Sequence, residues 1–196
     1  MISKLASIIA EKFIKNPNVN YNKVEIYQYG FFILLSNTIF FIITIIFGII
    51  FNSLVQSVIF YLSFFLIRQY AGGYHASTET KCEILSTFFI FTCVLIIYLS
   101  KIFDINDVLF HLGLFASLII AVISPLDSPE KTLSENEIKC FRRICLILLI
   151  IELCIIIISY YFKLSFIFKP ICIGIILESV LLIIGKIKKT LLKNQC

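Results

Sequence analysis

The stretch Phe31–Ile67 contains 37 residues and not one formally charged side chain. As a single helix rising about 1.5 Å per residue it would be roughly 55 Å long. That length far exceeds the ~30 Å thickness of the hydrocarbon layer of a bilayer. The stretch must therefore fold back on itself, and the polar pair Asn52-Ser53 is the natural turning point. The sequence thus predicts a membrane hairpin.

Composition extends this conclusion to the whole chain of 196 residues. Sixty per cent of the residues are hydrophobic, only 15% are charged, and the mean hydropathy is +1.01. Soluble domains carry roughly 25% charged residues, so one soluble core does not account for this chain. We therefore expect an all-α polytopic membrane protein, a single membrane-embedded domain over residues 1–196 with six transmembrane helices. The four spans after the hairpin are predicted at Ile84–Ser100, Val108–Leu126, Ile144–Phe162 and Leu164–Gly185.

The first 25 residues carry a different pattern. Apolar residues recur there at helical spacing, and the charged residues lie largely on the other side. This predicts an N-terminal amphipathic helix lying on the inner leaflet. It is not a secretory signal, because no apolar core with a small-residue cleavage site follows. Two uses stay open, a lipid-facing anchor and a platform for an amphipathic substrate leader.

Basic residues are distributed unequally between the two predicted sides of the membrane. With a cytoplasmic amino terminus, fourteen of the 17 lysines and arginines fall inside, and only Lys101, Lys163 and Lys169 fall outside. Since cytoplasmic loops are enriched in lysine and arginine, both termini and the Arg68–Cys82 segment are expected in the cytoplasm. The net charge of +5 then reflects topology and contact with anionic lipid, and no nucleic-acid binding is expected.

The polar segment Arg68–Cys82, RQYAGGYHASTETKC, separates the second predicted span from the third. It contains His75, one of two histidines in the chain, and Cys82 seven positions later. On a continuous helix these two residues would lie about 10.5 Å apart along the axis. A nucleophile and its base need to approach within roughly 3 Å. A working pair therefore requires the helix to be broken between them.

The sequence offers such a break. Thr80, followed by Glu83 just before an apolar run, has the form of a capping box and predicts that Thr80 is the N-cap of the third span. Cys82 would then lie in the first helical turn, where backbone N–H groups and the helix dipole stabilise a thiolate. The glycine pair at 72 and 73 permits a sharp turn that brings His75 back to Cys82.

Roles can be assigned on this arrangement. Cys82 is the candidate nucleophile, and His75 is the candidate general base that later protonates a leaving amine. Glu79 could orient the imidazole or simply cap the helix. Arg68 could bind a substrate carboxylate, help to hold an oxyanion, or serve only as an interfacial anchor. Spacing alone does not separate the catalytic pair from two loop residues of no special role.

The motif Ala71-Gly72-Gly73-Tyr74-His75-Ala76, preceded by Arg68 and followed by Cys82, resembles the accessory gene regulator protein B (AgrB) family. These proteins are membrane cysteine endopeptidases of Gram-positive quorum sensing. The layout is similar over most of the chain, including a proline-containing connector at Ser124–Pro129, but the specific match is concentrated in the motif. The resemblance implies functional roles for Arg68, Gly73, His75 and Cys82.

The resemblance also implies a substrate and partners. The substrate would be an AgrD-like propeptide with an amphipathic leader, a signal segment and an acidic tail, which the lysines after the last span could attract. Cys82 would cleave off the tail through a thioester, and a cysteine or serine of the propeptide would then close a thiolactone or lactone ring. The enzyme would act as a homodimer in the bacterial cell membrane, without cofactor or ATP.

Other residues leave alternatives open. The seven cysteines show no C-x-x-C spacing, so no metal site is expected. Glu152 and Glu178 lie inside apolar spans, where ionisable groups are costly and usually face the bundle interior. They could pair with each other, bind a basic substrate residue or be structural. They also support a second class of function, a non-catalytic six-span transporter, although no repeated halves are visible in the sequence.

Overall fold

The computed structural model describes residues 6–9, 11, 24–74, 76, 78–127 and 134–193. The chain divides into two compact units, residues 1–43 and residues 44–196. In the first unit, residues 6–9 and Glu11 are helical, and the helix α2 (Val24–Ile50) begins there. Most of the amphipathic helix predicted over the first 25 residues lies outside the described residues, so that helix stays a prediction.

Six helices in the described part of the chain are long and apolar enough to cross a bilayer, which confirms the predicted all-α, multi-pass membrane protein. The turn predicted at Asn52-Ser53 is also confirmed, because α2 ends at Ile50 and the next helix begins at Leu54. After α2 come the helices α3 (Leu54–Ala71), α4 (Glu79–Ile102), α5 (Asn106–Ile123), α6 (Glu135–Tyr161) and α7 (Ser165–Lys193).

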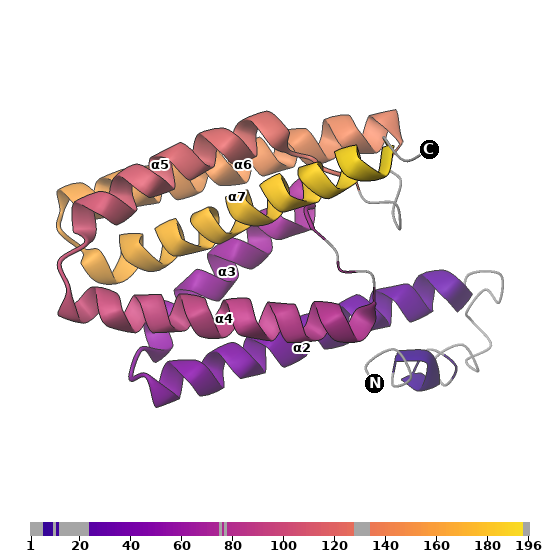
Figure 1. Ribbon diagram of the computed structural model, residues 1–196, viewed down its shortest axis with the longest axis horizontal. Coiled ribbons are helices and arrows are strands. Elements are labelled where there is room, and N and C mark those ends of the chain that lie inside the picture. The colour runs from indigo at the N-terminus through magenta and orange to yellow at the C-terminus, as the bar shows by residue number, and fades with distance from the viewer. Residues whose placement is uncertain are drawn as a thin grey trace. The chain divides into compact units, whose positions relative to one another are not determined.

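Helix α7 is the central helix of the second unit and packs against α3, α4, α5 and α6 (Figure 1). In the membrane-spanning segment of α7, 67% of the residues are buried. In each of its four neighbours the corresponding share is 33% or less. The reason lies in the sequence, since apolar residues surround α7 on all sides between Ile171 and Ile184. A helix that is apolar all round is buried by the others.

Two glycines set how closely the neighbours approach α7. A Cβ atom on Gly174 of α7 would lie 3.1 Å from Ser63 Oγ and 3.2 Å from the backbone nitrogen of Phe64, both on α3. A Cβ on Gly113 of α5 would lie 2.7 Å from Cys172 Sγ on α7. Small residues allow close helix contact in membranes, where packing replaces the hydrophobic driving force. The middle of α3 and part of α5 therefore lie directly against α7.

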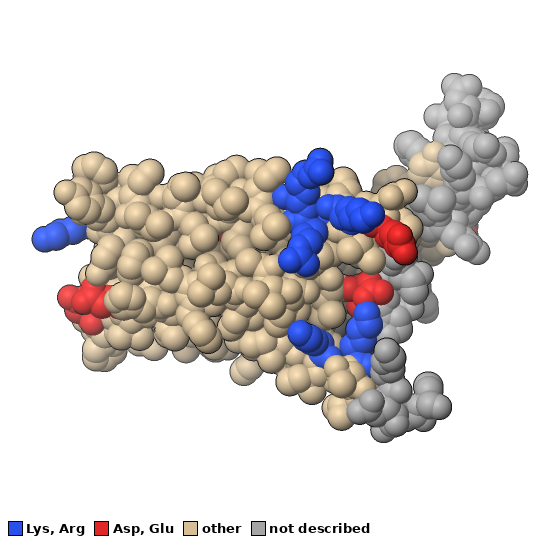
Figure 2. Space-filling view, turned by 90° about the horizontal axis from the view of Figure 1, so that it is seen from above, with Lys and Arg blue, Asp and Glu red and all other residues tan. Residues whose placement is uncertain are grey.

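On the face that Figure 2 shows, charged side chains gather toward the two ends, and a broad uncharged band lies between them. At one end Lys101 Nζ donates to the carbonyl of Asn52 at 2.7 Å, and Lys163 lies between α6 and α7. The other end carries the more numerous basic residues, as the sequence predicted; its assignment to the cytoplasm stays a prediction. Residues at that end include Arg68, Lys81, Arg142, Lys186, Lys188 and Lys189.

Candidate active site

The chain is not helical throughout the Arg68–Cys82 segment. Helix α3 ends at Ala71, and α4 begins only at Glu79. Gly72 and Gly73 have φ angles of 76° and 130°. Residues with side chains rarely adopt such angles, whereas glycine does so at little cost. The break that a catalytic pair requires is therefore present.

Helix α4 begins two residues earlier than the sequence suggested. Its N-cap is Thr78, which has an extended backbone and accepts a hydrogen bond from the Lys81 backbone N–H at 3.4 Å. The prediction that Thr80 is the N-cap, with Glu83 completing a capping box, is wrong. The earlier start adds the helical bond from the Cys82 N–H to the Thr78 carbonyl at 3.0 Å. It also places the Glu79 carboxylate at the positive end of the helix dipole.

Cys82 nevertheless lies in the first turn of α4, where its side chain is half-buried. Glu79 is the first residue of the helix and is exposed. His75 lies outside the described residues. Its pairing with Cys82, and the orienting role of Glu79, therefore stay predictions.

Arg68, in the last turn of α3, binds the turn that follows it. Its Nη1 donates to the carbonyl of Gly72 at 2.7 Å, and its Nη2 donates to the carbonyl of Tyr74 at 2.7 Å. The side chain is only 20% exposed. Hydrogen bonds from an ionised donor are roughly twice as strong as neutral ones, so this double contact fixes the turn firmly. The predicted contact of Arg68 with a substrate carboxylate or oxyanion stays a prediction.

Gly73 is buried beneath the guanidinium. A Cβ atom at this position would lie 2.0 Å from Arg68 Nη1, so a side chain here would displace the guanidinium from the turn. The glycine is thus required both for its φ of 130° and for the space that Arg68 occupies. The functional role that the sequence motif implied for Gly73 stays a prediction.

Helix α7 supports the same turn from the side. The Tyr74 N–H donates to the carbonyl of Leu181 at 3.1 Å. A Cβ on Gly185 would lie 2.8 Å from the Tyr74 nitrogen and 3.0 Å from the carbonyl carbon of Gly73. Glycine at 185 therefore allows the backbone of the turn to lie directly on α7. The sequence alone did not point to Leu181 or Gly185. The one signal that it offered was the position of Gly185, seven residues after Glu178 within an apolar helix.

The connector after α5 closes the site on another side. The Leu126 N–H donates to the carbonyl of Ala71 at 2.8 Å, and Gly72 and Leu126 form an isolated parallel β-bridge. The next residue, Asp127, pairs with Lys189 of α7. This part of the predicted Ser124–Pro129 connector is thus attached to the end of α3. Backbone pairing between such distant segments leaves no signal in a sequence.

The two acidic residues inside the spans do not pair with each other. Glu152 on α6 accepts a hydrogen bond from Ser63 Oγ at 2.9 Å. Glu178 on α7 lies 3.7 Å from Arg68, measured from Oε1 to Nη1. Both partners belong to α3, so the carboxyl groups join α3 to α6 and α7.

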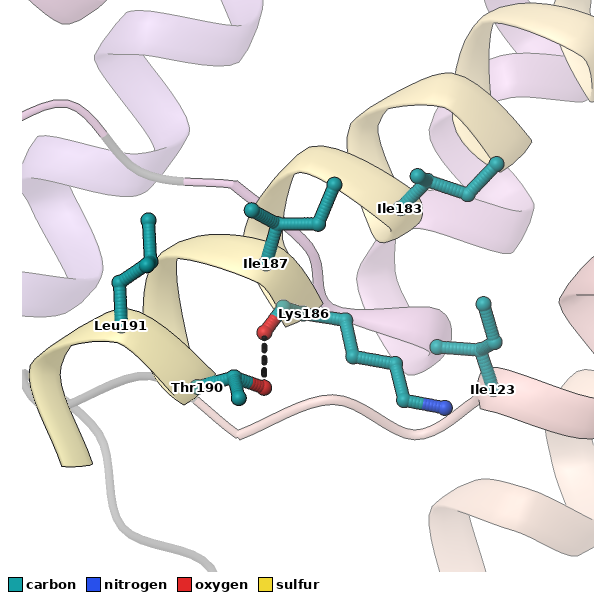
Figure 3. A pocket seen from close by; sticks show the side chains of 6 residues that line it. All are labelled: Ile123, Ile183, Lys186, Ile187, Thr190 and Leu191. Carbon is teal, nitrogen blue, oxygen red and sulfur yellow. Dashed lines mark hydrogen bonds between the residues drawn. The ribbon is translucent and has the colours of Figure 1, made fainter. Parts of the chain in front are cut away.

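A cavity of about 330 Å³ lies between the last part of α7 and the end of α5 (Figure 3). Most of its lining is apolar, and the Lys186 side chain extends along it toward Ile123 (Figure 3). The residues that line it are Ile123, Ile183, Lys186, Ile187, Thr190 and Leu191. Because neither Cys82 nor Arg68 is among them, this cavity is separate from the candidate active site.

Fold and site together define a class of protein. It is a multi-pass α-helical membrane protein. An arginine holds the glycine turn after one helix, and a half-buried cysteine lies in the first turn of the next helix. The family model described as Accessory gene regulator B matches residues 6–182, which include every candidate site residue. The chain therefore belongs to the accessory gene regulator B family, and this membership supports a role in the corresponding quorum-sensing system.

Individual relatives agree with this assignment. A protein of Clostridium perfringens strain 13 named AgrB-like protein 2 is 29% identical over 188 residues, which cover 90% of this chain and 86% of that protein. Accessory gene regulator protein B of Staphylococcus epidermidis is 29% identical over 137 residues, 69% of this chain and 67% of that protein. No solved structure matches the chain significantly.

Proposed function

We propose that this protein is a membrane cysteine endopeptidase that removes the C-terminal tail of an AgrD-like propeptide and permits its cyclisation. Cys82 is the nucleophile and His75 the general base. The observation that carries the proposal is the broken helix: a turn fixed by Arg68 directly precedes a helix whose first turn holds a half-buried cysteine. A turn of fixed geometry is what a base in the same short segment needs in order to meet its nucleophile.

The reaction proceeds in two acyl transfers. His75 takes the proton of the Cys82 thiol, and the sulfur attacks the carbonyl that joins the signal segment to the tail. A C–S bond forms, the C–N bond breaks, and the tail leaves as an amine that takes the proton from His75. A thiol or hydroxyl of the propeptide then attacks the thioester, loses its proton to His75 and releases Cys82. The product is a thiolactone or lactone, and no oxidant or ATP is consumed.

The other candidate residues position these groups. Arg68 and Gly73 shape the turn, and Glu79 orients the imidazole. The first N–H groups of a helix lack intrahelical acceptors, so the amides of Glu79 and Thr80 at the start of α4 are available to the oxyanion. Ring closure competes with hydrolysis of the thioester, and a site at the membrane boundary keeps water away.

The proposal extends to the substrate and the topology, and the charged end of the bundle supports both. The acidic tail of the propeptide is attracted by the basic residues around the turn, among them Lys188, whose Nζ lies 5.1 Å from the centre of the Tyr74 ring. This end faces the cytoplasm of a bacterial cell, as do both termini, and the amphipathic leader of the propeptide binds at the bilayer surface. The enzyme acts as a homodimer.

Co-expression with the propeptide encoded nearest this gene tests the proposal, with the intact mass of the peptide as the measurement. The wild type is expected to remove the mass of the tail, and Cys82→Ala is expected to remove none. His75→Ala should slow removal by roughly a hundredfold or more. Cys140→Ala is the matched control. Cys140 is exposed near the start of α6, so this variant should cleave the propeptide normally. Equal processing by Cys82→Ala would contradict the proposal and favour the transporter.

A further inference from the structure

Glu178 is the most deeply buried of the described acidic residues, with no exposed surface at all. Neither of its carboxyl oxygens accepts a hydrogen bond from the described part of the chain. A carboxyl group within a membrane span is costly, and residues that accept this cost usually have a function. The two-step reaction proposed above does not use Glu178 directly.

The cation nearest to this carboxyl group is Arg68. The distance of 3.7 Å between Oε1 and Nη1 is an ion-pair distance, longer than a hydrogen bond. An arginine side chain stays protonated in proteins, so its charge needs compensation once most of the side chain is buried. Away from water the attraction between the two groups is also stronger than at a surface.

The guanidinium lies between the carboxyl group and the glycine turn. A Cβ on Gly73 would be 2.0 Å from Arg68 Nη1 and 3.6 Å from Glu178 Oε1, so all three groups meet at one point. On the other side Arg68 donates to the carbonyls of Gly72 and Tyr74. Movement of the guanidinium would therefore move the turn.

The same face of α7 makes the remaining contacts to the turn. Leu181, three residues after Glu178, accepts from Tyr74, and Gly185, seven residues after it, provides the space for the turn. Residues three, four and seven apart share one face of a helix. Glu178 is thus the charged member of a continuous support, not an isolated polar residue.

We propose that Glu178 is a positioning residue of the active site. Its carboxylate holds the Arg68 guanidinium against the carbonyls of Gly72 and Tyr74, and through Arg68 it fixes the turn that leads to His75. This inference rests on the proposed peptidase function. Glu178 touches neither the substrate nor the reacting sulfur, and it acts only through Arg68.

The first test compares two isosteric variants of buried carboxyl groups in purified, lipid-reconstituted protein. Glu178→Gln is expected to lower kcat for tail release on the order of tenfold to a hundredfold with an unchanged KM, since a small misplacement of reacting groups has effects of this size. Glu152→Gln is the matched control, because Glu152 is also buried and bound to α3 but contacts Ser63, and it should retain the wild-type rate.

A second variant separates positioning from general packing. Glu178→Asp keeps the charge and should retain more of the rate than Glu178→Gln, although it fills the space less well. If Asp is no better than Gln, or if Glu152→Gln loses as much, the proposal is overturned. Full activity of Glu178→Gln would overturn it as well. Should Glu178→Gln fail to fold, a Glu178→Asp protein that folds like the wild type but releases no tail would have the same consequence.

A double-mutant cycle on the thermal midpoint tests whether Glu178 acts through Arg68, and it does not depend on activity. Arg68→Gln, Glu178→Gln and the double variant are compared. We expect the second substitution to cost little once the first is present, because the pair is already broken. Strictly additive shifts would contradict the coupling. If the cycle shows coupling and the wild type releases no tail, then the proposed function has failed while the ion pair stands.

Discussion

Two turns of this protein connect consecutive membrane helices at opposite ends of the bundle, and they are held in different ways. The α2–α3 turn is held mainly by its own neighbours: the Ser53 N–H donates to the carbonyl of Gly48 at 2.7 Å, and Ser57 Oγ donates to the carbonyl of Ser53 at 2.9 Å. One exposed cation, Lys101, also donates to the carbonyl of Asn52. The turn after α3 is held by Arg68 together with segments from the connector after α5 and from α7.

The difference agrees with the catalytic role proposed for the turn after α3. A turn that only reverses the chain can be stabilised by local hydrogen bonds, and its sequence can vary within those limits. A turn that must present a catalytic group in one place is fixed from several directions by rigid helices. The predictions below test this contrast by disturbing matched positions in the two turns.

The largest effect is expected from alanine at Gly73. A Cβ there would lie 2.0 Å from Arg68 Nη1, and the φ of 130° is itself unfavourable for alanine. We expect Gly73→Ala to abolish tail release and to cost about 1–3 kcal/mol of stability from backbone strain alone. The measurements are intact mass of the peptide and the thermal midpoint of the protein.

The matched change in the other turn is Asn52→Gly. Asn52 has a φ of 48°, which asparagine tolerates better than most residues and which glycine adopts freely. This variant should process the propeptide like the wild type. Normal processing by Gly73→Ala would show that the turn after α3 is as tolerant as the hairpin turn.

A smaller effect on tail release is expected from changes to the basic side chain that binds each turn, Arg68 in one case and Lys101 in the other. Arg68→Lys keeps the charge but loses the planar fork that reaches two carbonyls at once, so tail release should fall by roughly tenfold. Lys101→Met removes the single, exposed contact to the carbonyl of Asn52 and should leave tail release unchanged. Initial rates of release, compared at equal amounts of folded protein, distinguish the two. Equal losses in both variants would remove the contrast between the turns.

The smallest effect is expected at the helix that supports the turn. A Cβ on Gly185 would lie 2.8 Å from the Tyr74 nitrogen, so Gly185→Ala must push the turn away from α7, and a loss of a few-fold in rate is expected. At Gly30 of α2 nothing lies within 4 Å of an added Cβ. Gly30→Ala should therefore leave the rate unchanged and stabilise the helix by up to about 1 kcal/mol. A faster enzyme with Gly185→Ala would contradict the packing described here.

The sequence predicted the fold well because membrane spans are encoded locally. An uncharged run that is too long for one span requires a turn, and Asn52-Ser53 is the polar pair nearest its middle. The break near Gly72 and Gly73 was predictable for the same reason, since two adjacent glycines before a polar stretch disfavour a helix. The N-cap was misplaced by two residues because Thr78 and Thr80 are chemically equivalent candidates. The earlier start adds helical backbone hydrogen bonds, beginning with the one from the Cys82 N–H to the Thr78 carbonyl.

The contacts that hold the site could be predicted only in part. Arg68, Gly73 and Cys82 were identified through the motif, although the motif did not show what Arg68 binds. The partners Leu126, Leu181 and Glu178 are far away in the sequence, and two of the three contacts involve backbone atoms, which every residue has. Only Glu178 gave a signal, as a charge in an apolar span, and that signal did not name its partner.

The most direct test of the central claim is to trap the acyl-enzyme. A propeptide in which the thiols and hydroxyls of the signal segment are replaced by alanine cannot close the ring, so the thioester should accumulate. We predict that the intact mass of the wild-type protein rises by that of the leader and signal segment, that hydroxylamine removes the adduct, and that peptide mapping places it on Cys82. An adduct on another residue, or release of the tail with no adduct sensitive to hydroxylamine, would contradict the account.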